Sequence, residues 1–228
     1  MALYDTDLPV RSDITAAHET MLDRWANPGT WWTGAERLAI VAEVRRARDA
    51  AETPPPWVRA STVDGLIPDG GILPAAAVDA VWRLTNHPGT LTAEWYESIV
   101  GDEVSAAQYT ELVGVVAQAN CIDRFVDALD IGRATLPDAV AGKPTGEVPD
   151  DIDVRKHWVP TAQIQGPNVL KALSAVPEEN VSRGILSQAH YLPEGALMGD
   201  LVSDHNSLTR LQIELLAART SKLNECFY

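Results

Sequence analysis

Three short segments of this sequence carry the same signal for the start of a helix. In each of 33–36, 105–108 and 209–212, a Thr or Ser is followed three residues later by Glu or Gln, which is the pattern of a capping box. Each segment opens a run whose apolar residues recur at helical spacing. Because no run of alternating apolar and polar residues predicts a strand, the sequence favours an all-α fold.

The same spacing predicts further helices along the chain. A long helix over 106–129 has apolar residues on two faces, so we expect it to be central. Between 131 and 165, Gly and Pro recur and periodicity is absent, which predicts a linker or a loop strapped across the helices. The other expected helices cover 12–26, 34–51, 75–85, 92–100, 167–176, 178–190 and 196–202, followed by the stretch that begins at 209.

The charge of the chain limits its partners. A formal net charge of −14 argues against nucleic acid, which needs a basic surface, and against anionic membranes.

No apolar run reaches the ~18–20 residues that span a bilayer. The first residues lack the basic and apolar regions of a secretory signal, and two cysteines, Cys121 and Cys226, suit a reducing compartment. We therefore expect a cytoplasmic protein without nucleic-acid or membrane partners.

The candidate catalytic residues lie in the last stretch of the sequence, where Glu214 and Cys226 are twelve positions apart. On one straight helix this separation is roughly 18 Å, too far for the two groups to interact. Asn224 is suited to end one helix and to cap the next. Cys226 would then lie in the first turn of a new helix, where free N–H groups and the helix dipole stabilise a thiolate.

These residues resemble the alkylhydroperoxidase AhpD and carboxymuconolactone decarboxylase family. Redox-active members carry Glu…Cys-x-x-Cys-x-x-x-His after a Leu-Thr helix start, and Glu214 and Cys226 match the glutamate and the first cysteine. The second cysteine and the histidine would follow Tyr228, so the given chain holds half of the motif. The resemblance implies a helical bundle, commonly a homo-oligomer, that reduces hydroperoxides with an external thiol reductant and needs no metal or organic cofactor.

Two related helical units are expected. When Thr33 is placed on Thr209, Leu38 falls on Glu214 and Ala50 on Cys226. The first copy therefore has neither the carboxylate nor the thiol, and we expect it to be structural only. The units would be residues 1–133, degenerate, and 166–228, with the Glu…Cys motif, joined by a loop-rich linker at 134–165.

Other interpretations remain open for the same residues. Cys226 could be a buried structural cysteine, Glu214 could simply pair with Arg210 one turn away, and Cys121 lies in an apolar helix that favours a core position. The five histidines do not form a helical metal pair. The alternative functions are a non-catalytic helical oligomerisation protein and, less favoured because no basic or His-lined pocket is evident, a cofactorless decarboxylase of the sister branch.

In the stretch that begins at 209, one face of the helix is expected to be buried between copies or subunits. Its apolar stripe consists of Ile213, Leu216, Ala217, Thr220, Leu223 and Phe227.

Overall fold

The structure is a computed structural model, and it describes residues 3–50, 57–59, 71–166, 168–192 and 207–223. Within these ranges the only β-structure is an isolated bridge between Asp153 and Thr161, so the predicted all-α class is confirmed. The helices are α1 (Ser12–Ala26), α2 (Gly34–Asp49), α3 (Ala75–Asn86), the 3₁₀ helix η2 (Pro88–Thr90), α4 (Ala93–Ile99), α5 (Ala106–Ala128), α6 (Asn168–Lys171), α7 (Pro177–His190) and α9 (Arg210–Leu223). No helix in the described part of the chain is both long and apolar enough to cross a membrane.

The predicted capping boxes start the helices. At α2, the Thr33 hydroxyl accepts from the Glu36 N–H, and the Glu36 carboxylate accepts from the Thr33 N–H at 2.8 Å. The boxes at the starts of α5 and α9 have the same reciprocal bonds. Each box satisfies backbone donors that have no partner within the helix. The helix expected over 167–176 is shorter, because α6 ends at Lys171 and the chain turns before Pro177 begins α7. The helix expected over 196–202 lies outside the described residues.

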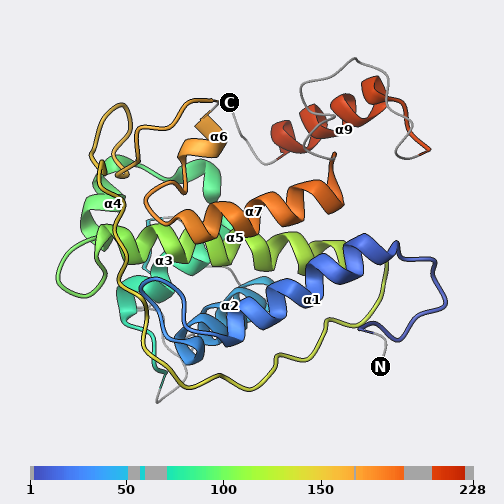
Figure 1. Cartoon of the computed structure of the whole chain (residues 1–228), viewed down its shortest axis with the longest axis horizontal. Coiled ribbons are helices and arrows are strands. Elements are labelled where there is room, and N and C mark those ends of the chain that lie inside the picture. Colours follow the sequence, from blue (N-terminus) through green and yellow to red (C-terminus); the bar gives the residue numbers. More distant parts are fainter. Residues whose placement is uncertain (1–2, 51–56, 60–70, 167, 193–206, 224–228) are drawn as a thin grey trace.

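Helix α5 is the centre of the bundle, as its two apolar faces predicted. It packs against α1, α2, α3 and α7 (Figure 1). Leu112, Val115 and Ala119 on α5 are completely buried, and α7 contributes Leu186 and Ala189 to the same core. Helix α7 therefore shares one hydrophobic core with α1–α5.

The segment after α5 is irregular and runs along the bundle beside α1 and α2 (Figure 1). Its backbone N–H groups donate to carbonyls at the end of α1 and in the α1–α2 turn, from Val140 to Ala26 at 2.8 Å and from Gly146 to Thr30 at 2.8 Å. Gly146 has a φ of +67°, which glycine adopts without strain. These bonds hold the segment, which we call the strap (residues 132–149), against the end of α1.

Helix α9 lies apart from the bundle, next to the end of α7 (Figure 1). Among the described residues of its predicted apolar stripe, Ile213 alone is buried, at 7% exposed, while Leu216 and Leu223 are 55% and 68% exposed; Phe227 lies outside the described residues. Both leucines are exposed in the single chain, because the buried residues of α9, Arg210 and Ile213, lie in its first turn. Their burial between copies or subunits stays a prediction.

A histidine pair joins α1 to α7. The Tyr4 hydroxyl and His18 Nδ1 share a hydrogen bond at 2.6 Å, and His18 Nε2 lies 2.7 Å from Nε2 of His190, with the two rings stacked. Of the two facing Nε2 atoms, one donates and the other accepts, so at most one of them needs a proton. Burial, and then the neighbouring His190, lower the pKa of His18 to about 4. Burial also lowers the pKa of His190.

We predict that this pair makes the fold less stable in mild acid. Above pH 6.5, His18 is neutral in both the folded and the unfolded protein. Between pH 6.5 and about pH 4, His18 is protonated in the unfolded chain but stays neutral in the folded protein, so acid favours unfolding. From pH 7 to pH 5, the free energy of unfolding should fall by about 2 kcal/mol because of His18. Urea titrations of the wild type and His18→Gln measure this, and an equal loss in both proteins would contradict it.

Candidate functional site: a buried arginine between two glutamates

The structure describes one of the two predicted site residues. Glu214 is on α9, and its carboxylate accepts from Arg210 Nε at 2.6 Å and from the Tyr191 hydroxyl at the end of α7. The hydrogen bond from Tyr191 and then the one from Arg210 lower the pKa of Glu214, so it is ionised at neutral pH. The pairing with Arg210 that the sequence offered as an alternative is therefore present.

Cys226 and Asn224 lie outside the described residues, so the predicted approach of Cys226 to Glu214 stays a prediction. The described part of helix α9 runs from Arg210 to Leu223, so the turn expected at Asn224 also stays a prediction. The other cysteine, Cys121, packs against the hydrophobic core as predicted. Burial raises the pKa of its thiol to about 11, so Cys121 is protonated and unreactive at neutral pH.

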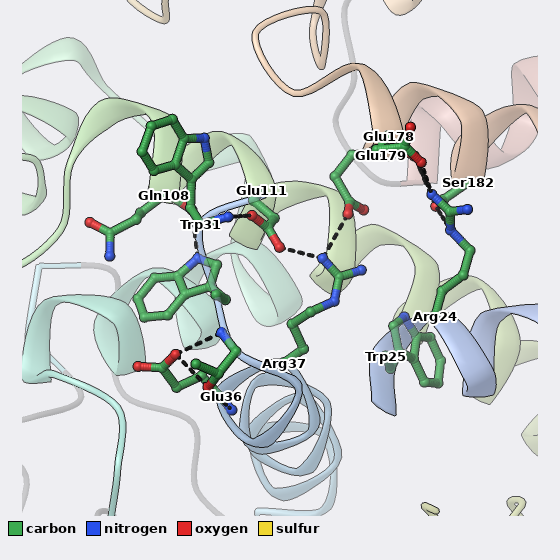
Figure 2. Close-up of polar contacts among 12 residues, drawn as sticks. Arg24, Trp25, Trp31, Glu36, Arg37, Gln108, Glu111, Glu178, Glu179 and Ser182 are labelled. Atoms are coloured by element: carbon green, nitrogen blue, oxygen red, sulfur yellow. Dashed lines mark hydrogen bonds and ion pairs between the residues drawn. The ribbon is translucent and has the colours of Figure 1, made fainter. Parts of the chain in front are cut away.

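A group of deeply buried charges lies in another place. Arg37 of α2 lies between Glu111 of α5 and Glu179 in the first turn of α7, and these three side chains are 2%, 0% and 1% exposed. One terminal nitrogen, Nη1, donates to both carboxylates: to Glu111, and to Glu179 at 2.9 Å (Figure 2). A single guanidinium thus joins three helices.

The outer oxygens of both carboxylates also accept hydrogen bonds. The backbone N–H of Trp31 donates to Glu111 at 2.5 Å, and the Gln118 side-chain amide donates to Glu179 at 2.5 Å. The Gln118 oxygen in turn accepts from the indole N–H of Trp25 at 2.9 Å, which adds α1 to the network. All four carboxylate oxygens therefore have a donor, as buried charges require.

The charges of this network do not cancel when all its groups are ionised. Burial alone would lower the pKa of Arg37, but the charges of Glu179 and Glu111 outweigh it, so the guanidinium stays charged. Burial raises the pKa of Glu111, although Arg37 opposes this. Glu111 is therefore the place where an extra proton would neutralise the network.

Two glycines make room for the carboxylates. A Cβ at Gly29 would collide with the Glu111 carboxylate and with Arg37, and a Cβ at Gly114 would lie 2.7–2.8 Å from the side chain of Glu179. Gly114 is in the middle of α5, so its backbone approaches α7 more closely than any other residue type would allow. The sequence therefore supplies space for the network as well as its polar groups.

A cavity of about 460 Å³ lies beside the network. Arg37 and Glu179 line its inner wall, the end of α1 and the α1–α2 turn form one side, and the strap contributes Thr145 and Glu147. No group of three His, Cys, Asp or Glu side chains suitable for a metal occurs in the described ranges. The chemistry within reach is hydrogen bonding, charge pairing and proton transfer.

Sequence reasoning missed Arg37, Glu111 and Glu179, although a signal was present. Glu111 and Gln118 fall on the same helical face as Val115 and Ile122, a face predicted to be buried. A polar residue on such a face must find a partner. Periodicity predicts that such a residue is buried, but it does not identify the partner. Arg37 is 74 positions from Glu111, and Glu179 is 61 positions from Gln118.

Comparisons with family models, with curated proteins and with solved structures give no match for this chain. The resemblance to the AhpD family therefore rests on the last stretch of the sequence, around Glu214 and Cys226.

We predict opposite effects for alanine at two mid-helix glycines. Gly114→Ala should destabilise the fold by about 1–3 kcal/mol, because its methyl group would overlap Glu179. Gly184→Ala in α7 is the matched control: nothing lies within 4 Å of its added Cβ, so it should stabilise the fold by up to ~1 kcal/mol through helix propensity. Urea midpoints of both variants measure this, and equal effects would contradict the close approach.

Proposed function

We propose that the protein is a thiol-dependent oxidoreductase of the AhpD-like type, which reduces hydroperoxides through Cys226 with Glu214 as proton acceptor. The observation that supports this most directly is the state of Glu214. It is an ionised carboxylate on α9, held by Arg210 and Tyr191. Such a carboxylate can accept and return a proton.

In the proposed reaction, the Cys226 thiolate attacks the terminal oxygen of the hydroperoxide and the O–O bond breaks. Glu214 takes the thiol proton beforehand and returns it to the alkoxide that leaves, which becomes an alcohol. Cys226 is oxidised to a sulfenic acid, and an external dithiol reduces it back with release of water. The raised pKa of Cys121 leaves Cys226 as the candidate for this thiol.

We predict that the chain consumes cumene hydroperoxide when dithiothreitol is the reductant. Cys226→Ser should abolish turnover and Glu214→Gln should slow it about 100-fold, because a positioned base is lost. Cys121→Ser is the control and should keep the wild-type rate. Turnover that survives Cys226→Ser would sink the proposal.

The rate of alkylation against pH gives a second readout of the same thiol. Cys226 should titrate below the ~8.5 of a free thiol if amides and a helix dipole stabilise its thiolate. A value at or above 8.5 would support the alternative interpretation, in which the fold is kept without the chemistry.

That alternative, a helical oligomerisation protein, is favoured by one observation. Four leucines on α9 are largely exposed in the single chain: Leu211, Leu215, Leu216 and Leu223, at 66%, 70%, 55% and 68%. Exposed apolar side chains gathered on one element are typical of an interface. We propose that a second copy of the chain covers them, with or without catalysis.

For this interface, light scattering should give at least a dimer. The double substitution Leu211→Glu and Leu215→Glu should shift the protein toward the monomer, because it places charges in the contact. Val181→Glu, at a side chain 49% exposed on α7, is the control and should leave the mass unchanged. A monomeric wild type would contradict the interface.

A further inference from the structure

We propose that the cavity beside Arg37 binds a small organic cation with a neutral carbonyl group, such as an amino-acid amide or the N-terminal residues of a peptide. The site lies at the end of α1 and is separate from Glu214. It does not depend on the proposed thiol chemistry.

The inner wall of the cavity offers donors. Both oxygens of Glu179 already accept, from Arg37 and from Gln118, so this carboxylate has little left for a ligand. Thr30 is 4% exposed and lines the cavity, and its hydroxyl has no partner among the described residues. The second terminal nitrogen of Arg37 makes no hydrogen bond in the described chain and points away from Glu111 (Figure 2). A ligand must present an acceptor to this wall.

The rim of the cavity offers carboxylates. Asp23 and Glu147 are exposed and form no ion pair with any described residue. Glu178, 63% exposed, pairs with Arg24 at 2.7 Å through one oxygen. The lining holds four carboxylates and two guanidinium groups, a formal excess of two negative charges. A positively charged group is therefore favoured at the rim.

The inner acceptor is a neutral carbonyl and not a carboxylate. The charge of Arg37 is already matched by Glu111 and Glu179, so a third carboxylate would meet two like charges at short range. A carbonyl oxygen accepts from Thr30 and Arg37 without that repulsion. The cavity, at about 460 Å³, lies within the usual range for small-molecule sites and has room for a dipeptide.

The test uses three compounds of matched length: alanyl-alanine amide, its N-acetylated form, and N-acetyl-alanyl-alanine. They carry one positive charge, no charge and one negative charge at pH 7. Calorimetric titration should show saturable binding of the first, binding at least about tenfold weaker for the second, and none for the third. N-Butylammonium, which lacks the carbonyl, should also bind more weakly than the first.

Substitutions in the lining test whether the amide binds in this cavity. Thr30→Val removes the inner hydroxyl at nearly constant shape, and Glu147→Gln removes one rim charge; each should weaken binding of alanyl-alanine amide several-fold. The matched control is Thr20→Val, on the exposed face of α1, where the hydroxyl bonds to the Ala16 carbonyl at 2.8 Å. It should bind like the wild type, as should Cys226→Ser.

Three outcomes would overturn the proposal: no saturable binding of alanyl-alanine amide, equal binding of the N-acetylated acid, or unchanged affinity in both cavity variants. Loss of peroxidase activity would leave this test unaffected, because Cys226→Ser is expected to bind normally. The two proposals can therefore fail separately.

Discussion

The fold depends on one buried guanidinium. Arg37 is joined to Glu111 and Glu179, and through Gln118 to Trp25, so that four helices meet at a single set of hydrogen bonds. Burying these charges costs several kcal/mol per ion before pairing. Removing one member would leave an uncompensated charge, which typically costs 3–5 kcal/mol. The network thus fixes how α7 docks on α2 and α5, since apolar contacts alone would tolerate small shifts.

The same network explains the shape of its surroundings. Glycines stand where the carboxylates need space, at Gly29 in the α1–α2 turn and at Gly114 on α5. The strap closes over the turn through backbone hydrogen bonds to Ala26, Gly29 and Thr30. The cavity lies between the strap, the end of α1 and the start of α7, so its wall is built from segments that are far apart in the sequence.

Two regions of the protein therefore concentrate charge for different reasons. Around Arg37, all four carboxylate oxygens accept hydrogen bonds, whereas Nε and the second terminal nitrogen of the guanidinium make none among the described residues. At the end of α7, Tyr191 and Arg210 hold Glu214 on a helix that is largely exposed, and the carboxylate stays ionised. The first arrangement joins four helices, and the second holds one ionised carboxylate near the surface.

The sequence by itself determined the all-α class, the capping boxes at Thr33, Ser105 and Thr209, and the central place of α5. These features are local: a cap needs residues three positions apart, and a helical stripe needs its own periodicity. The core position of Cys121 follows from the same periodicity.

Only the tertiary structure decided which buried polar groups meet. Glu111, Arg37 and Glu179 come from three helices, and no local pattern encodes a pairing across 74 or 142 positions. It also decided that the buried residues of α9 lie in its first turn, so that Leu216 and Leu223, on the apolar stripe that the spacing predicted, are exposed in the single chain. Periodicity shows that a helix has an apolar face, and the packing of the whole chain determines whether anything within that chain covers it.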